Sequence, residues 1–131
     1  MSRVRGKDTG PEMRVRRAAH ARGLRFRLHS AALPGRPDLV FPSRMVAVFV
    51  HGCFWHRHEG CRRSTNPKTR ADFWRDKFAA NVARDARTTL ALQNLGWTVQ
   101  VIWECETANQ ETLDTILDDL TAKPIVPPKS T

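Results

Sequence analysis

An eleven-residue segment that runs from His51 to Cys61 restricts the possible folds of this chain more than any other stretch. It contains two of the three cysteines and three of the five histidines, together with Phe54 and Trp55. A hydrophobic core does not need this mixture, whereas thiolates and imidazoles are the usual ligands of structural zinc. A metal would also fix the irregular segment 51–69, which is otherwise long for a loop in a small domain.

The spacing of these residues predicts a zinc site. Cys53, His58 and Cys61 have the spacing of zinc ligands. Cys105 lies at the C-terminal end of one predicted strand, and Cys53 follows another. If those strands are neighbours, three thiolates and one imidazole close a tetrahedral shell at one sheet edge. A closed shell leaves no position for substrate, so we expect a structural zinc. Two alternatives remain: inert buried cysteines with a surface histidine, or His56 in place of His58.

The charge of the chain indicates a polyanionic partner. Lys and Arg number 22 against 13 Asp and Glu, which gives a net charge of +9. DNA or RNA is the leading candidate, and a merely soluble basic protein is the alternative. No apolar run approaches the roughly 20 residues that span a bilayer, and we see no N-terminal signal segment. We therefore expect a cytoplasmic protein with reduced cysteines.

The length of 131 residues and the 40% hydrophobic content predict a single globular domain. We expect a basic N-terminal arm over residues 1–10, one domain over 11–122, and a flexible tail over 123–131. Within the domain the sequence predicts helices at 11–22, 70–94 and 110–121, and strands at 24–28, from Asp38, at 45–50 and at 97–103.

This order of elements predicts an α/β domain with a mixed sheet. The first strands can form a meander, and the last needs a crossover through the long helix, so it should be parallel to its neighbour. We expect Gly23 and Gly96 to end helices and Thr69 to cap the long one. Apolar residues of the long helix recur at helical spacing and are expected to face the core: Phe73, Trp74, Phe78, Val82, Ala86 and Leu90.

A second group of residues has the chemistry of phosphodiester hydrolysis. Asp38 begins a short strand and His51 follows the next one, so a hairpin would bring them together. The carboxylate is a hard ligand for magnesium, which can neutralise phosphate charge and help to activate water. A histidine can remove or supply a proton near neutral pH. His51 and His56, which zinc does not use, fit these roles.

Other polar residues are ambiguous when taken alone. Lys77, Asn81 and Asp85 recur every four residues on the long helix and form a polar stripe, which is most simply a solvated face. Glu12 is most simply a favourable charge at the start of the first helix.

Five stretches together carry a family resemblance: Leu33-Pro-Gly-Arg-Pro-Asp38, Val48-Phe-Val-His51-Gly-Cys-Phe-Trp-His56, Phe73-Trp74 with Lys77, Asn81, Arg84 and Asp85, Gly96-Trp97, and Trp103-Glu-Cys105. In this order and at similar spacing they resemble the very short patch repair (Vsr) endonucleases, from about residue 1 to 120. The resemblance implies a restriction-endonuclease-like three-layer fold, a mixed sheet flanked by helices, and a structural zinc. It also implies magnesium-dependent nicking of DNA 5′ to the thymine of a T:G mismatch, which arises when 5-methylcytosine is deaminated.

The resemblance implies roles for individual residues. Asp38 matches the magnesium-binding aspartate, and the backbone carbonyl of Val50 would be a further ligand. The remaining matched active-site residues are His51, His56, Asp85 and the acidic Glu12, with His56 the strongest acid/base candidate. The matched zinc ligands are Cys53, His58, Cys61 and Cys105.

The resemblance also implies DNA contacts. Phe54, Trp55 and Trp74 match aromatics that wedge into the base stack, which costs less at a weak T:G pair. Burial under the loop or core packing is the structural alternative for these three residues. Further matched or basic candidates are Met1 in the minor groove, Lys77 and Asn81 at the mismatched pair, and Arg3, Arg5 and Arg36 at guanines or phosphates.

The chain departs from the family pattern at three places. Val50 stands where family members often have threonine, the interval from His58 to Cys61 is one residue longer, and basic residues that usually precede Met1 are missing. The alternatives to a mismatch nickase are a restriction-type or modified-DNA nuclease and a non-catalytic zinc-bearing DNA-binding module. We expect a bacterial, nucleoid-associated monomer, because the mismatch is asymmetric, with mismatch-repair proteins as candidate partners.

Overall fold

The computed structural model describes residues 10–122 of the chain. The predicted tail, and all of the predicted arm except Gly10, lie outside the described residues. The predicted DNA contacts of Met1, Arg3 and Arg5 lie outside them too. No helix within residues 10–122 is both long enough and apolar enough to cross a membrane.

The predicted mixed α/β architecture is confirmed. The elements in chain order are α1 (Gly10–Ala21), β1 (Arg27–Leu28), β2 (Leu39–Phe41), the 3-10 turn η1 (Pro42–Arg44), β3 (Val46–His51), α2 (Ala71–Asn94), β4 (Thr98–Trp103), α3 (Glu104–Thr107) and α4 (Gln110–Thr121). The four strands form one sheet in the order β1-β2-β3-β4. The first three are antiparallel neighbours and β4 runs parallel to β3, as the meander and the crossover through α2 predict.

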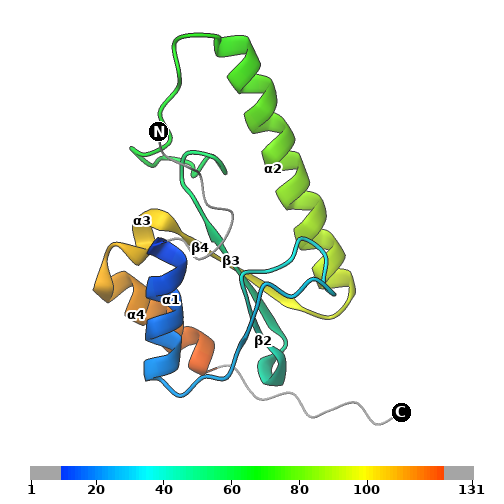
Figure 1. Ribbon diagram of the computed structural model, residues 1–131, viewed down its shortest axis with the longest axis vertical. Coiled ribbons are helices and arrows are strands. Elements are labelled where there is room, and N and C mark those ends of the chain that lie inside the picture. The colour runs from blue at the N-terminus through cyan, green and yellow to red at the C-terminus, as the bar shows by residue number, and fades with distance from the viewer. Residues whose placement is uncertain (1–9, 123–131) are drawn as a thin grey trace.

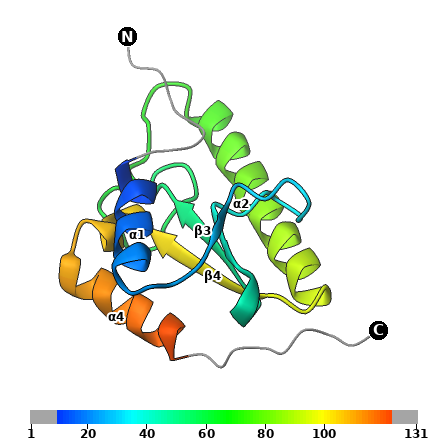
Figure 2. The same ribbon diagram turned by 60° about the horizontal axis from the view of Figure 1, so that its bottom comes forward.

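Helices cover both faces of this sheet. Helices α1 and α4 pack together on one face, and α2 runs along the other (Figures 1 and 2). The main core lies between the sheet and helices α1 and α4. It consists of Val15, Ala18, Ala19, Leu24, Leu39, Phe41, Val46, Val48, Ile102, Leu113, Leu117 and Leu120. Side chains alternate along a strand, so Val46 and Val48 enter this core while Phe49 and His51 point to the α2 side. The central strand therefore ends with His51 facing α2.

The predicted helix ends at Gly23 and Gly96 are confirmed. Both glycines have positive φ, 72° and 92° respectively. After α1, the backbone N–H of Leu24 donates to the carbonyl of Ala19 at 3.1 Å. This closes a Schellman-type end, which favours glycine because it carries no Cβ.

Three local predictions need correction. Thr69 does not cap α2: the N-cap residue is Arg70, with a φ of 55° and no side-chain capping hydrogen bond. The strand predicted over 24–28 is shortened to Arg27–Leu28, because only these residues pair with β2. The short helix α3 was not predicted, since nothing in the sequence separates it from the strand that it follows.

The prediction that one apolar face of α2 enters the core holds for Phe78 and is wrong for most of the face. Phe73, Val82 and Leu90 are 45%, 46% and 58% exposed, and the buried residues of α2 are Phe78 and Leu92. The N-terminal half of α2 extends past the end of the sheet, beside the segment that follows β3 (Figure 1). Periodicity identifies an apolar face, but it does not say whether a sheet lies under all of it.

Candidate active site and metal centre

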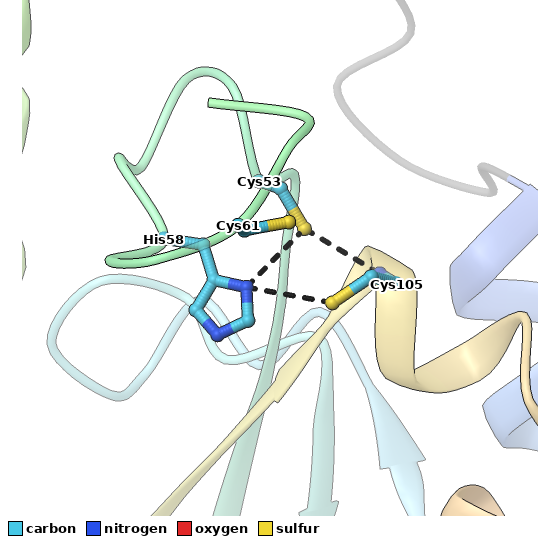
Figure 3. Close-up of side chains that lie close together, drawn as sticks. All are labelled: Cys53, His58, Cys61 and Cys105. Carbon is cyan, nitrogen blue, oxygen red and sulfur yellow. Dashed lines mark hydrogen bonds between the residues drawn. The ribbon is translucent and has the colours of Figure 1, made fainter. Parts of the chain in front are cut away.

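The structure brings the four predicted zinc ligands together at the ends of β3 and β4. The donor atoms of Cys53, His58, Cys61 and Cys105 lie within 4.8 Å of one another, and their side chains converge on one point (Figure 3). The Nδ1 atom of His58 is 3.7 Å from Cys53 Sγ and 3.4 Å from Cys105 Sγ. Since the described cysteines form no disulfide, all three sulfurs are available as ligands.

These distances fit a tetrahedral metal. Ligands placed about 2.1–2.3 Å from a tetrahedral zinc ion are about 3.6 Å apart, which the two sulfur–nitrogen distances of 3.4 and 3.7 Å approach. The cluster includes His58, so the alternative in which His56 is the ligand does not match the geometry. A Cys3His set of this kind can hold a metal ion and has no fifth donor among residues 10–122.

Residues at the end of β4 and in the segment between β3 and α2 support the ligands. The Trp103 ring stacks on the His58 imidazole, with centroids 4.3 Å apart and an interplanar angle of 10°. The backbone N–H of Cys53 donates to Glu104 Oε1 at 3.4 Å. The Ser64 hydroxyl donates to the carbonyls of Cys53 and His58, at 2.8 and 2.9 Å. These contacts hold the ligand segment against the end of the sheet.

A cleft of about 600 Å³ lies beside this centre, between the segment 29–38, the end of β3 and α2. Its lining includes four of the predicted active-site residues, Asp38, His51, His56 and Asp85, and also the predicted DNA contact Arg36. Strand β2 pairs antiparallel with β3, so Asp38, just before β2, lies close to His51 at the end of β3, as the predicted hairpin requires. Helix α2 adds Asp85, so the polar stripe on that helix is not simply a solvated face.

His56 is oriented by Asp85. Its Nδ1 atom lies 2.7 Å from Asp85 Oδ2. A carboxylate partner places the proton on Nδ1 and leaves Nε2 for proton transfer. The rings of His56 and His51 stack with centroids 3.9 Å apart and an interplanar angle of 6°. Both imidazoles therefore face the same part of the cleft.

His51 is a neutral imidazole at pH 7. Burial, and then the nearby charge of His56, lower its pKa to about 4, although Asp85 opposes the shift. Its Nδ1 atom is buried and has no hydrogen-bond partner within residues 10–122. A neutral ring with a lone pair can accept a proton, which a histidinium cannot.

Asp38 is bound to the neighbouring strand and is held in a partly buried position. Its Oδ2 atom accepts a 2.7 Å hydrogen bond from the backbone N–H of Val50. Burial raises the pKa of Asp38 to about 6, and the charge of Glu12 adds to the rise, while the Val50 N–H and His29 lower it. A carboxylate whose charge is this poorly solvated is well placed to bind a cation.

Glu12 is more than a charge at a helix start. It is 2% exposed, and its Oε2 atom pairs with Arg16 and lies 2.7 Å from His29 Nε2. Donor atoms of Glu12, His29 and Asp38 lie within 4.8 Å of one another. His29 was not predicted, because nothing in its local sequence links it to Glu12, which lies 17 positions earlier.

Gly35 allows the segment that carries Asp38 to reach α2. Its φ is 73°, and a Cβ atom at this position would lie 2.3 Å from Thr88 Cγ2 and 3.3 Å from Phe49 Cζ. Both the backbone conformation and the close approach therefore require glycine.

Replacing Gly35 with alanine should lower the free energy of unfolding by about 2–4 kcal/mol, from a left-handed backbone and a steric clash. Gly23→Ala is the matched control, because Gly23 has a φ of 72° but no atom within 4 Å of its added Cβ. Denaturant unfolding would measure both variants. Equal losses in the two would contradict the close contact between this segment and α2.

The aromatic residues predicted to wedge into DNA form a cluster at the end of α2. Trp55 packs on Trp74 with centroids 5.6 Å apart, and Phe54 packs edge-on against Phe78 at 5.1 Å. Phe54, Trp55 and Trp74 are half-buried, so they contact one another and still reach the surface. The structural alternative, in which these rings are simply buried, therefore holds for part of each side chain, and the rest is exposed to solvent.

Arg57, which was not predicted to have a role, holds this cluster in place. Its guanidinium lies 4.1 Å from the Phe78 ring centroid. It also donates to the carbonyls of Phe54, Ser64 and Thr65 at 3.0–3.1 Å. An arginine at this position could be taken for another phosphate contact, since its neighbours in sequence do not reveal these acceptors.

Two further predicted DNA contacts, Lys77 and Asn81, lie on α2, and Arg36 lies in the segment that lines the cleft beside it. Asn81 donates to the carbonyl of Trp55 at 3.3 Å and accepts from Arg84 at 2.9 Å. Lys77 is exposed one turn earlier, and Arg36 is exposed at the cleft. Asn81 lies one turn before Asp85 of the cleft and contacts Trp55 of the aromatic cluster, so the cleft and the cluster are neighbours along α2.

Comparison with known proteins identifies the class to which this arrangement belongs. Residues 1–63 match the family profile described as DNA mismatch endonuclease Vsr. The chain is 51% identical to the type II nicking enzyme V.XorIIP of Xanthomonas oryzae over 92% of this chain and 88% of that protein. It is 42% identical to the DNA mismatch endonuclease Vsr of Escherichia coli, over 86% and 72% of the two chains. It is also 37% identical to the type II nicking enzyme V.NmeAIP of Neisseria meningitidis, over 84% and 78%.

These relatives are DNA endonucleases, and the protein is a DNA endonuclease of the same class. The chain belongs to the Vsr family, as the resemblance in the sequence predicts.

Proposed function

We propose that this protein is a mismatch-directed DNA nickase that cuts one strand 5′ to the thymine of a T:G mismatch formed by deamination of 5-methylcytosine. One observation carries the proposal: Asp38, His51, His56 and Asp85 line a single cleft. The name of the Escherichia coli relative supports mismatch recognition, and the names of other relatives support nicking. The wider fold would be restriction-endonuclease-like, with residues 11–122 as its single domain.

The residues of the cleft fit magnesium-dependent hydrolysis. Asp38 and the backbone carbonyl of Val50 would hold the ion, with Glu12 nearby, because hard cations prefer oxygen ligands. Bound there, magnesium would neutralise phosphate charge and lower the pKa of a bound water. Neutral His51 would accept a proton from the attacking water. His56, held by Asp85, would donate a proton to the departing oxygen, a contribution typically worth about 10²–10⁴-fold in rate.

The Cys3His cluster would hold zinc as a structural ion. Its donor set is soft and closed, which suits zinc and leaves no open position for substrate. It would attach the aromatic cluster to the sheet beside the cleft, because His58 and Phe54 belong to the same short segment.

Mismatch recognition would use the aromatic cluster. Inserting rings into a base stack costs a few kcal/mol per step, and the cost is smaller where the pair is already weak. Phe54, Trp55 and Trp74 are half-buried beside the cleft, so they can reach a base step near the cut. Lys77 and Asn81 would face the mismatched pair, and Arg36 would contact phosphate or guanine. Met1, Arg3 and Arg5 would add contacts from the arm.

The cellular setting is part of the proposal. A basic DNA endonuclease with bacterial relatives would act in the cytoplasm on the nucleoid. An asymmetric mismatch needs one active site, so we expect a monomer, and mismatch-repair proteins are candidate partners.

Labelled duplexes that differ at one pair test this function. With magnesium, we expect a single nick 5′ to the thymine of T:G, and cleavage of the matched T:A duplex about 100-fold slower, which corresponds to about 2.7 kcal/mol. A third duplex with 5-methylcytosine paired to guanine should remain intact. Cutting of both strands, or equal rates on T:G and T:A, would favour a restriction-type or modified-DNA nuclease. DNA binding without nicking would favour a non-catalytic DNA-binding module.

A further inference from the structure

His29 occupies an unusual position next to the cleft. It follows β1 with a φ of 45°, a conformation that few residues other than glycine adopt. Its backbone N–H donates to the carbonyl of Asp38 at 3.2 Å, so the two residues lie on adjacent chain segments. The imidazole is 17% exposed and contacts the buried carboxylate of Glu12. The ring therefore belongs to the lining of the cleft.

The spacing of the surrounding donors suits one cation. The nearest donor atoms of Glu12, His29 and Asp38 lie within 4.8 Å of one another. Two adjacent ligands at about 2.1 Å from an octahedral ion are about 3.0 Å apart. His29 Nε2 and Glu12 Oε2 are 2.7 Å apart, which is a hydrogen-bond distance. Loss of the proton between them and a small movement of the ring would let both atoms contact the same ion.

The donor set differs from one made only of oxygen. Two carboxylates and one imidazole suit manganese and later first-row metals, whereas magnesium binds oxygen almost exclusively. Arg16 pairs with Glu12 and offsets part of its negative charge. This lowers the electrostatic attraction for any divalent ion alike, so the nitrogen ligand is what distinguishes one ion from another.

We propose that His29, with Glu12 and Asp38, binds a divalent transition metal such as Mn²⁺ at the nuclease cleft, and that its imidazole makes the site prefer that ion to Mg²⁺. The proposal rests on the proposed function, because Asp38 is the expected magnesium ligand there. It adds a ligand and a metal preference to that site.

Binding of Mn²⁺ to the zinc-loaded full chain tests this inference without any activity assay. Free Mn²⁺ is measured by electron paramagnetic resonance, Mg²⁺ by its competition with Mn²⁺, and a bound imidazole by nitrogen modulation in pulsed spectra. In His29→Gln we expect Mn²⁺ affinity to fall about tenfold or more, a loss typical of a removed metal contact. Mg²⁺ affinity should change less than about threefold, since a ligand that magnesium barely uses is lost. The nitrogen modulation should disappear.

His20→Gln is the matched control, because His20 is an exposed histidine on α1 and its loss should change none of these readings. If His29→Gln weakens both ions equally, or keeps the nitrogen modulation, His29 only orients Glu12 and the inference is overturned. Asp38→Asn separates this outcome from failure of the proposed function. Unchanged binding of both ions in Asp38→Asn would remove the metal from the proposed active site, whereas unchanged binding in His29→Gln overturns only the present inference.

Discussion

Asp38→Asn should abolish nicking of the mismatched duplex, with a rate loss of about 10³-fold or more, and should leave DNA binding largely intact. The asparagine keeps an oxygen that can accept the hydrogen bond from Val50 N–H, so the strand pairing survives. It lacks the charge that binds a cation, and metal ions contribute several kcal/mol to reactions of this kind. Quenched-flow cleavage and fluorescence anisotropy on the same duplex measure the two quantities.

The same variant should be as stable as the wild type, or more stable, when no magnesium is added. Burial raises the pKa of Asp38 to about 6, so the folded state holds this proton more tightly than the unfolded state does. Stability from this group is then present at low pH and is lost as pH rises from about 4 to about 6. At pH 7 the substitution removes a cost on the order of 3 kcal/mol.

Asp119→Asn is the matched control for Asp38. Asp119 is exposed on α4, a helix that packs on the face of the sheet opposite α2 (Figure 2), whereas α2 contributes to the cleft. Its loss should change neither nicking nor binding. Nicking by Asp38→Asn within about tenfold of the wild-type rate would reject Asp38 as the metal ligand, because loss of a catalytic charge contact typically costs at least about 10²-fold.

Cys105→Ser should release the structural metal and lower stability by several kcal/mol. Structural zinc contributes about 10 kcal/mol or more to small zinc-dependent folds, and here one ion would join β3, β4 and the segment between them. In a domain of this size a loss of about 3 kcal/mol lowers Tm by about 10 °C. Elemental analysis should find one zinc per wild-type chain and none in the variant, and thermal denaturation followed by circular dichroism measures Tm.

Ala108→Ser is the control for this change, because Ala108 is exposed just after α3 and is not a ligand. It should keep one zinc and the wild-type Tm. A strong chelator should lower the wild-type Tm to that of Cys105→Ser and have little further effect on the variant. A variant that retains one equivalent of zinc, or unfolds at the wild-type temperature, would show that the cluster is not a structural metal site.

Much of the fold follows from patterns that are short in sequence. The valine-rich run became the central strand β3, and the apolar spacing of α4 buried Leu113, Leu117 and Leu120. Gly23 ended a helix because only a residue without Cβ easily adopts its φ. Each of these outcomes depends on residues within a few positions of one another, so local propensity and periodicity are sufficient.

Candidate residues of the site were also recognisable, although their roles stay predictions. Asp38 and His51 flank strands that a hairpin must join, and the spacing of the cysteines and histidines narrows the possible metal ligands. Strand order then brings Cys105 to Cys53, since β3 and β4 are parallel neighbours and their ends coincide. Simple topology was enough for that contact, because few arrangements of so short a sheet are allowed.

Tertiary structure alone decided which faces were covered and which distant charges met. The periodicity of α2 was correct, yet Val82 and Leu90 stay exposed, at a hollow that Val101 of β4 also lines. Glu12 reached His29 only because α1 packs beside the end of β1, 17 residues further along the chain. Residue types and spacing encode what a segment can form, whereas burial, charge pairing and pKa depend on the distances that packing sets.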